Sequence, residues 1–450
     1  MSQYKPYPAY KDSGVEWLGP VPEHWDVLRL GQFGLFSKGS GSTKQDEQPT
    51  GVPCIRYGDL YTTHTHFIEG SRSCVAVDRA QDYTPLRYGD ILFAASGETA
   101  EEIGKSAANL LTADARCGGD IIIFRSTAPV DPKFMGYALD SQPSVFQKSG
   151  MGKGYTVVHI YPSQLRNLLL AMPTQSEQRR VAAFLDREAA RIDALIEKKQ
   201  RLIELLKEKR QAVITQAVTK GLDPNVPMKD SGVEWLGEVP EHWDVRRIKH
   251  LVGSCEQGWS PQCENRQADA LEYGVLKVGC VNGGTFSPSE NKALPPDFEP
   301  RTQYAIKAGD FLVSRANTKE LVGSAAIVED DWPYLILCDK LYRLRFRGTI
   351  DPKYIGYYLR SHPAREQIEL SASGASNSMQ NIAQAAILDL VIATPPRNEV
   401  AMIMVRLTAV LSNLAEIESK TAKSVDLLKE HRSALITAAV TGQIDVRDAA

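Results

Sequence analysis

The sequence lacks the features that mark membrane, secreted and metal-binding proteins. Its 450 residues contain no run of about eighteen apolar residues, so we expect no membrane span. The N-terminal residues include no apolar segment of the kind found in signal peptides. The seven cysteines are scattered without a Cys-x-x-Cys pair, and Cys255 and Cys263 have no histidine at zinc-ligand spacing. These absences predict a cytoplasmic protein with buried free thiols, no metal site and no membrane contact.

An excess of positive charge is also absent, because 52 basic residues face 55 acidic ones and the formal net charge is −3. Proteins that coat nucleic acid without specificity depend on surplus lysine and arginine, so this class is excluded. Specific binding through local basic patches, or together with a more basic partner, stays open. At 450 residues the chain also exceeds what one hydrophobic core usually organises, so we expect more than one domain.

One apparent nucleotide-binding motif does not meet the physical requirements of a phosphate loop. Residues 97–106 read GETAEEIGKS. A phosphate-binding loop has four residues between its first glycine and the Gly-Lys-Ser sequence, because the backbone wraps a phosphate at a fixed radius. Six residues intervene here, and the glutamates among them would repel a phosphate. The sequence therefore predicts no nucleotide site at this position.

What the sequence does contain is an internal repeat. Residues 11–30 read KDSGVEWLGPVPEHWDVLRL, and residues 229–248 differ from them at three positions only. A second pair follows at a similar offset, LLKEKRQAVITQAVT at 205–219 and LLKEHRSALITAAVT at 427–441. The segments between these pairs are largely unlike each other. Repeated segments are expected to perform one task twice, and the divergent segments two different tasks.

The first copy of the proline- and tryptophan-rich segment, residues 1–25, is too rich in proline for a long helix or strand. We expect a short segment anchored by aromatic side chains. Two interpretations stay open for the tryptophans: they fill the core of their own domain, or they form a docking surface for a partner. The candidate docking residues are Trp17, Trp25, Trp235 and Trp243.

Residues 26–172 mix short apolar runs with loops and predict a first mixed α/β domain. Residues 90–93 and 120–124 have the length and composition of strands, and Asp131-Pro132-Lys133 opens a stretch with helical spacing. Residues 244–394 predict a second mixed domain with the same skeleton, since Gly-Asp-Phe-Leu at 309–312 matches Gly-Asp-Ile-Leu at 89–92. The loops that follow these strands differ between the two domains.

Each mixed domain is followed by a long helical segment. Residues 173–219 contain strong helix formers, with Thr174 or Ser176 as the expected N-cap. Apolar residues recur at alternating steps of four and three, as in a coiled-coil seam. The seam residues are Val181, Leu185, Ile192, Leu195, Leu202, Leu206 and Val213 in the first helix and Ile403, Leu407, Val410, Leu414, Ile417, Leu428 and Leu435 in the second.

These segments predict an α+β chain with a pseudo-twofold internal repeat. Two mixed α/β domains are joined by two long helices, which we expect to pair as an antiparallel coiled coil because the second must return along the first. Such a two-headed particle suits a duplex ligand with two separated half-sites. The expected parts are a stub (1–25), a domain (26–172), a helix (173–219), a linker with the repeated stub (220–243), a domain (244–394), a helix (395–442) and a tail (443–450).

At this point the chain resembles the specificity subunits of type I restriction-modification systems. The resemblance rests on the doubled SGVEWLG-x-VPEHW stub, the Gly-Asp strands and Ala171-Met172-Pro173 followed by Glu177-Gln178. It rests further on the repeated helix ends and on residues 315–323, and it covers essentially the whole chain. One departure is that Glu399 of the second helix is followed by valine rather than glutamine, which puts strict equivalence of the two docking sites in question.

The resemblance implies two target recognition domains that each read half of a bipartite DNA sequence, with the helices setting the spacer. It implies two modification subunits that methylate adenine with S-adenosylmethionine, and restriction subunits that use ATP and Mg²⁺. This chain itself contains no methyltransferase [DNS]-P-P-[YFW] motif, no cofactor glycine loop and no phosphate loop. We therefore expect a noncatalytic subunit whose partners supply the chemistry and the cofactors.

Base reading requires arginine or lysine for guanine and asparagine or glutamine for adenine, on loops that reach a groove. Each candidate could equally be a solvated loop residue or a phosphate contact, and Asn317 could be a turn former. The candidates are Lys38, Ser42, Lys44, Lys105, Lys148, Lys153 and Tyr155 in the first domain and Arg315, Asn317, Lys319, Asn377 and Gln380 in the second.

Two other classes of protein are weighed against a specificity subunit. A self-sufficient methyltransferase-nuclease would need the catalytic motifs that are missing. A coiled-coil scaffold without a nucleic acid role would not need two divergent, loop-rich domains.

Overall fold

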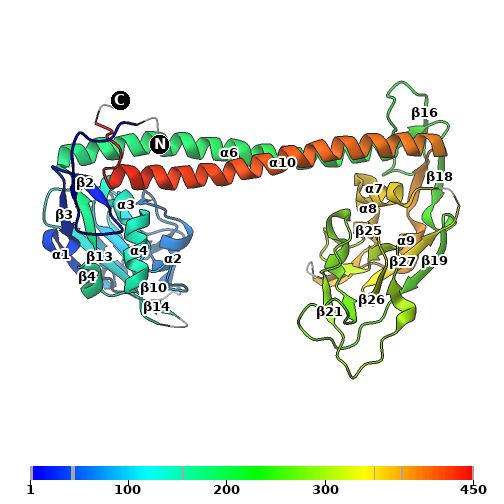
Figure 1. The fold of residues 1–450 in the computed structure, drawn as a ribbon, viewed down its shortest axis with the longest axis horizontal. Coiled ribbons are helices and arrows are strands. Elements are labelled where there is room, and N and C mark those ends of the chain that lie inside the picture. Colours follow the sequence, from blue (N-terminus) through cyan, green and yellow to red (C-terminus); the bar gives the residue numbers. More distant parts are fainter. Residues whose placement is uncertain (1–3, 42–45, 155–156, 349, 377–378, 448–450) are drawn as a thin grey trace. The chain divides into compact units, whose positions relative to one another are not determined.

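The structure is a computed structural model that describes residues 4–41, 46–154, 157–348, 350–376 and 379–447. The chain divides into two compact units: unit 1 comprises Met1–Gln200 with Lys423–Ala450, and unit 2 comprises Arg201–Ala422. Figure 1 shows the ribbon of each unit. The two long helices, α6 (Gln175–Thr219) and α10 (Arg397–Val440), each contribute one part to unit 1 and another to unit 2.

Unit 1 is built on a five-stranded sheet and a four-stranded sheet. The larger has the order β4 (Gly34–Lys38), β13 (Ile121–Ser126), β9 (Ile91–Ala94), β11 (Ser106–Asn109), β6 (Phe67–Ile68). The smaller has the order β7 (Ser73–Val75), β5 (Val52–Ile55), β12 (Ala115–Cys117), β8 (Thr84–Leu86). Strands β9 and β13 are apolar and buried along residues 91–94 and 121–124, as their sequence predicts.

Short strands and helices complete unit 1. The paired strands are β1 (Tyr10–Asp12) with β2 (Pro20–Pro22), β3 (Asp26–Arg29) with β15 (Leu169–Met172), and β10 (Ser96–Gly97) with β14 (Val158–His159). The helices are α1 (Leu30–Phe33), α2 (Tyr57–Thr62), α3 (Pro132–Leu139), α4 (Gln142–Met151) and α5 (Pro162–Leu165). Helix α3 begins at the predicted point because the Asp131 carboxylate accepts a hydrogen bond from the Phe134 amide.

Unit 2 repeats this plan with two four-stranded sheets. Their orders are β19 (Val252–Gln257), β27 (Leu341–Phe346), β23 (Phe311–Ser314), β25 (Ala325–Ile327), and β21 (Asn291–Ala293), β20 (Gly274–Leu276), β26 (Trp332–Ile336), β22 (Ala305–Ile306). A three-stranded sheet has the order β24 (Ala316–Asn317), β29 (Met379–Asn381), β28 (Ser373–Ser376). Two strand pairs are β16 (Met228–Asp230) with β17 (Glu238–Pro240) and β18 (Asp244–Arg247) with β30 (Val391–Thr394).

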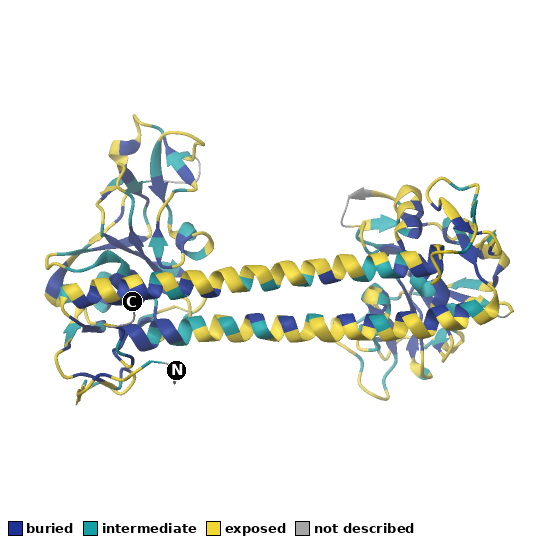
Figure 2. Ribbon diagram, turned by 90° about the horizontal axis from the view of Figure 1, so that it is seen from above, coloured by how far each residue is buried: buried dark blue, intermediate teal, exposed yellow. Residues whose placement is uncertain are grey.

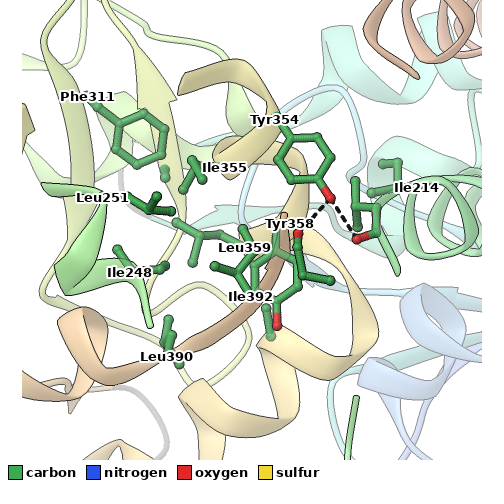
Figure 3. Packing of buried hydrophobic residues seen from close by; sticks show 14 of the residues in the cluster. Ile214, Ile248, Leu251, Phe311, Tyr354, Ile355, Tyr358, Leu359, Leu390 and Ile392 are labelled. Atoms are coloured by element: carbon green, nitrogen blue, oxygen red, sulfur yellow. Dashed lines mark hydrogen bonds between the residues drawn. The ribbon is translucent and has the colours of Figure 1, made fainter. Parts of the chain in front are cut away.

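Three helices of unit 2, α7 (Pro352–Arg360), α8 (His362–Ser371) and α9 (Gln384–Asp389), pack with the long helices. The buried Tyr354 of α7 donates its hydroxyl to the carbonyl oxygens of Val218 in α6 and Ala393 in β30. Figure 3 shows this contact beside Ile214, Leu359 and Ile392. A single side chain thus joins the end of one long helix to the strand that precedes the other.

Within each unit the long helices run side by side in opposite directions. In unit 1 the first half of α6 packs Val181 and Leu185 with Leu435 near the end of α10. In unit 2 the second half of α6 packs Leu206 with Leu407 and Leu414 near the start of α10. Helix α6 begins after Thr174, whose hydroxyl accepts a bond from the Glu177 amide, so Thr174 rather than Ser176 caps it.

The seam prediction is wrong for three residues, because Leu195, Leu202 and Ile417 are 41%, 41% and 45% exposed. A pair of helices covers only a narrow stripe of each, whereas the helix ends also pack on a mixed domain. Buried positions are most frequent at the ends of both helices (Figure 2). Toward the middle, the covered stripe passes through the half-buried Ile196 and Ile203 of α6 and the buried Thr421 and Val425 of α10.

One stretch of α10 has a mean hydropathy of 1.6 over 18 residues, so by length and composition alone this helix could cross a membrane. A single helix of this kind is weak evidence, since core helices of folded proteins pass the same test. Helix α10 places Ile403 and Leu407 in the core of unit 2 and Leu435 in that of unit 1.

Candidate nucleic-acid interface

In each unit the Gly-Asp strand leads into a short edge strand that pairs with a segment far along the chain. In unit 1, β9 is followed by β10, where Ser96 lies opposite His159 of β14. In unit 2, β23 is followed by β24, where Asn317 lies opposite Gln380 of β29. The segments that follow the Gly-Asp strands therefore meet a second segment of their own domain. We call each meeting point the reading edge: residues 96–97 with 158–159 in unit 1, and residues 316–317 with 380–381 in unit 2.

The Gly-Asp pairs fix the turn that begins each of these strands. Gly89 and Gly309 both have φ of +85°, a conformation that favours glycine. Asp90 accepts hydrogen bonds from the Arg87 amide and from the Arg125 guanidinium at 2.7 and 2.6 Å. Asp310 takes the same place in unit 2. Because these aspartates are buried and paired, the Gly-Asp motif is structural and presents no group to a ligand.

The reading edge of unit 1 centres on three residues. The Ser96 hydroxyl lies 3.1 Å from Nδ1 of His159. The backbones of Lys153 and His159 exchange two hydrogen bonds, of 3.0 and 2.8 Å, which bring Lys153 to the same edge with its side chain exposed. The predicted candidate Lys38, at the end of β4, is exposed as well.

Lys148 is a wrong prediction, because its side chain is only 1% exposed. Its ammonium donates to the carbonyl oxygens of Gly104 and Leu139 at 2.8 and 2.9 Å. Burial lowers the pKa of Lys148 to about 8. The ammonium ties α4 to the loop after β10 and cannot reach a groove. The ammonium of Lys105 is also paired within the fold, since its Nζ lies 2.6 Å from the Asp140 carboxylate.

The reading edge of unit 2 carries Arg315, Asn317 and Gln380, all half-buried. Arg315 is held by a bond from its amide to the Lys340 carbonyl oxygen, 2.8 Å, and its guanidinium lies 3.3 Å from the Asp339 carbonyl oxygen. Lys319 is exposed, with its ammonium 3.6 Å from Glu369.

The contacts of Asn317 are compatible with both roles considered for it, a turn former and a base contact. Its side-chain oxygen accepts a bond from the Thr318 amide at 2.9 Å, as in a turn former. Its side-chain amide donates to Oδ1 of Asn282 at 3.1 Å. The turn bond fixes the side chain in one orientation, which leaves the amide at the reading edge of unit 2.

Ser42, Lys44, Tyr155 and Asn377 lie outside the described residues. The structure adds three residues that the sequence did not single out: Ser96, His159 and Asn282. No local pattern marks them, because their position at the reading edge results from pairing between segments that lie 35 to 63 residues apart.

The tryptophans of the repeated stub divide into two kinds. Trp25 and Trp243 are fully buried, so the core interpretation applies to them and neither presents its surface to a partner. Trp25 packs against Tyr7 with ring centroids 5.8 Å apart, in a cluster with Leu18. Trp17 and Trp235 are 45% and 38% exposed, and only these two remain candidates for docking.

The first turns of the two long helices are more alike than their sequences indicate. Nε2 of His24 lies 3.0 Å from the Glu177 carboxylate, and Nε2 of His242 lies 2.8 Å from Glu399. The glutamine of the Glu-Gln pair, Gln178, has a separate task, because it accepts a bond from the Asp131 amide. The missing glutamine in the second helix therefore leaves the contact between stub and helix intact.

The C-terminal segment lies against the first stub within unit 1. The Tyr10 hydroxyl donates to the Gly442 carbonyl oxygen at 3.1 Å, and the Asp445 amide donates to the Lys5 carbonyl oxygen at 2.7 Å. This is the return of the chain that the helix repeat predicts. The start of α6 and the end of α10 thus meet one stub in unit 1.

Within the described ranges, no group of three or more His, Cys, Asp or Glu side chains is arranged to hold a metal ion, and all seven cysteines are free. Burial raises the pKa of Cys117 and of Cys338 to about 12 in each case. These thiols remain protonated at neutral pH and are poor nucleophiles.

No protein-family model matches the chain. The EcoEI type I restriction enzyme specificity subunit of Escherichia coli is 33% identical over 186 residues, 41% of this chain and 31% of that protein. The MjaVIII type I restriction enzyme specificity subunit of Methanocaldococcus jannaschii is 24% identical over 440 residues, 95% of each chain. The first match thus spans less than a third of its relative, and the second spans nearly all of it.

Two solved structures share the fold. A chain from a study of complex assembly and conformational transition of the type I R-M system has a TM-score of 0.71 and 18% identity, covering 94% of this chain and 99% of that one. The HsdS subunit from Thermoanaerobacter tengcongensis has a TM-score of 0.53 and 18% identity, covering 94% and 98%. Together with the named relatives, these matches confirm the resemblance that the sequence shows.

Proposed function

We propose that this chain, whose homologues are type I restriction enzyme specificity subunits, reads a bipartite DNA target for partner enzymes in the cytoplasm. Each mixed domain would read one half of the target through its reading edge. The chain would carry no catalytic step itself, in line with the noncatalytic role of its homologues.

The proposal rests on one observation: both units have the same backbone arrangement at the reading edge but present different side chains there. Both units place an edge strand after the Gly-Asp strand and pair it with a distant segment. Unit 1 presents Ser96, His159 and Lys153 there, whereas unit 2 presents Asn317 and Gln380. Asparagine and glutamine in unit 2 suit adenine, whereas the serine, histidine and lysine in unit 1 suit other base edges. Two half-sites of different sequence are therefore expected.

The long helices suit the role of a spacer. At 1.5 Å per residue, the 45 residues of α6 extend about 67 Å. The opposite directions of α6 and α10 within each unit support an antiparallel pair along their whole length. A pair of that kind would hold the two reading edges at a fixed separation, which sets the number of unread bases between the half-sites.

The repeated stubs support two copies of one partner. In each unit an exposed tryptophan, Trp17 or Trp235, lies on a stub held to the long helices through His24 or His242. We propose that two modification subunits dock on these repeats and methylate adenine with S-adenosylmethionine. Restriction subunits would join them with ATP and Mg²⁺, so that the cofactors belong to the partners.

The experiment that tests this function is co-expression with the cognate modification subunit, followed by single-molecule sequencing of host DNA for methyladenine. A split motif with a fixed gap is the expected result and would also supply the target. A stable complex that methylates no motif would contradict DNA reading by this chain. If no complex formed and no duplex were bound, a coiled-coil scaffold would describe the protein better.

A further inference from the structure

Unit 2 contains a cavity of about 590 Å³ between its mixed domain and its long helices. Aromatic side chains form part of the wall, among them Phe286, Trp332 and Tyr357. Arg210 enters from α6 and Arg360 from the last residue of α7. The cavity therefore combines an apolar lining with two guanidinium groups.

Neither guanidinium has an ion-pair partner among the described residues. Nε of Arg210 is buried and makes no hydrogen bond. Burial, and then the nearby charge of Arg210, lower the pKa of Arg360. The cavity also contains Glu329 and Asp330, but Glu329 is paired with Lys353 at 3.1 Å and its side chain is 73% exposed. A guanidinium without a partner in such a place is costly unless an anion joins it.

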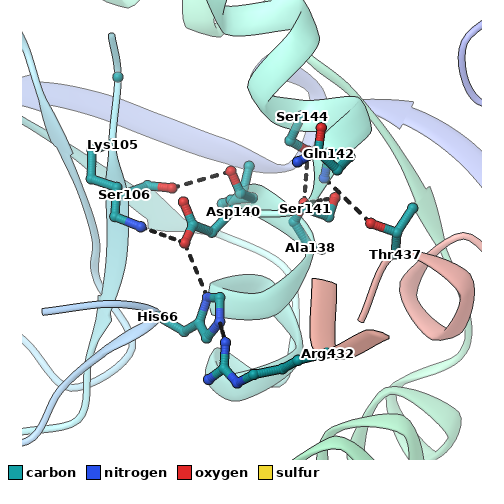
Figure 4. A network of polar contacts seen from close by, with 12 residues as sticks. His66, Lys105, Ser106, Ala138, Asp140, Ser141, Gln142, Ser144, Arg432 and Thr437 are labelled. Carbon is teal, nitrogen blue, oxygen red and sulfur yellow. Dashed lines mark hydrogen bonds and ion pairs between the residues drawn. The ribbon is translucent and has the colours of Figure 1, made fainter. Parts of the chain in front are cut away.

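The corresponding place in unit 1 is filled by charges of the chain itself. Arg432 occupies the position in the helix repeat that Arg210 has in its copy. Its Nε lies 3.0 Å from an Asp193 carboxylate oxygen, and its Nη1 lies 3.4 Å from Nε2 of His66. The other ring nitrogen of His66 lies 3.1 Å from Asp140, which also binds Lys105. Figure 4 shows the part of this network that runs from Arg432 through His66 to Asp140 and Lys105.

At the two positions where unit 1 has the carboxylates of Asp140 and Asp193, unit 2 has other residues. Asp140 follows α3, whereas Arg360 ends α7, and both helices begin with an Asp-Pro-Lys sequence. The offset of 222 residues that relates Arg210 to Arg432 also relates Asp193 to Ala415, which lines the cavity. The same cation is thus balanced internally in unit 1 and meets a second cation in unit 2.

We infer that the cavity of unit 2 binds an anion from outside the chain, and that this anion is a backbone phosphate of duplex DNA. This inference rests on the proposed function. The wall at Gly283-Gly284, where φ is +76° and +84°, directly follows Asn282, the residue that bonds Asn317 at the reading edge. A duplex on that edge brings phosphates to the same loop, and guanidinium groups bind phosphate oxygens through paired hydrogen bonds.

The test uses the complex of this chain with its modification subunit. Its affinity for a target duplex and for an unrelated duplex is measured between about 50 and 200 mM salt, where phosphate contacts dominate the salt dependence. Arg360→Gln removes one charge, and Arg360→Asp supplies the carboxylate that unit 1 has at this place. Arg360→Lys keeps the charge as a check on folding.

For Arg360→Gln we expect the slope of log affinity against log salt to fall by about 1 for both duplexes, and the affinity to fall about eightfold near 0.1 M salt. Arg360→Asp should fold normally, because Arg210 gains a partner, and should bind DNA at least as weakly. Arg432→Gln is the matched control. Its position has internal partners, so its slope should equal that of the wild type.

An unchanged slope in both Arg360→Gln and Arg360→Asp would overturn the inference. Loss of complex formation without DNA would overturn it too, in favour of a carboxylate of the partner subunit. Binding to the unrelated duplex separates this inference from the proposed function. A wild-type complex without any target motif would refute sequence reading, yet its salt slopes would still report whether a phosphate contacts Arg360.

Discussion

The two copies of the stub offer a comparison in which the sequence around a buried tryptophan is matched and the hydrogen bond of its indole is not. Trp25 and Trp243 are both fully buried. The indole N–H of Trp243 donates to the Glu399 carboxylate at 3.0 Å, whereas that of Trp25 has no partner among the described residues. Replacing each tryptophan with phenylalanine should therefore have unequal effects.

Both substitutions remove ring atoms from a packed site, which costs about 1.5 kcal/mol in each unit. Trp243→Phe also removes a bond to a charged group, worth about 1.5 kcal/mol at the lower end, since Glu399 keeps His242. Trp25→Phe instead removes an unsatisfied buried donor, which returns about 1 kcal/mol. We expect the opening free energy of the stub to fall by about 3 kcal/mol in Trp243→Phe and by about 0.5 kcal/mol in Trp25→Phe.

A single unfolding free energy is poorly defined for a chain of two units, so the assay must be local. Hydrogen exchange followed by mass spectrometry reports the opening free energy of peptides from each stub separately. Each variant serves as the control for the other, because the untouched stub should keep its wild-type protection. Equal losses in the two stubs, or a larger loss for Trp25→Phe, would refute the reasoning.

Three further predictions concern the domains, the helices and the buried lysine. Replacing residues 26–172 with the corresponding domain of a relative should change one half of the methylated motif, and a change in both halves would contradict the assignment of one domain to one half. Inserting about one heptad into each long helix should lengthen the spacer and leave the half-sites unchanged, as sequencing of methyladenine would reveal. Because the pKa of Lys148 is lowered to about 8, the folded state loses its proton before the unfolded state does. The stability of unit 1 relative to a Lys148→Met variant, measured by hydrogen exchange of peptides from α4, should rise from pH 8 toward the ordinary lysine pKa, and a difference that does not change with pH would show that the ammonium is not buried.

Much of the fold follows from local patterns in the sequence. The lack of glycine and proline after Pro173 predicts one uninterrupted helix over 173–219, and the structure begins it two residues later, at Gln175, and ends it at Thr219. The apolar runs at 91–93 and 121–124 are strands, and Asp131-Pro132 begins a helix. These elements are predictable because the signals act within a few residues of chain, through capping, propensity and periodicity.

The candidate site was predicted less completely, and Lys148 explains why. Its sequence, at the start of the lysine- and glycine-rich stretch 148–155, is that of an exposed cation, yet three oxygens from two other segments surround its ammonium. In the opposite direction, His159 lacks any local signal and reaches the reading edge through the pairing of β10 with β14. Burial of a charge and convergence at an edge depend on contacts across the chain, which local patterns do not encode.

By itself the sequence determined that this protein is built twice from one plan, since the stubs and helix ends repeat almost letter for letter while the loops diverge. Only the tertiary structure decided which charged side chains are paired inside the fold and which face outward. Arg210 and Arg432 have nearly the same neighbours in sequence. In the fold, however, Arg432 meets the Asp193 carboxylate, whereas Arg210 meets a second arginine, Arg360. The physical reason is that electrostatic balance is set by the groups that packing brings within a few ångström, and those groups come from distant segments.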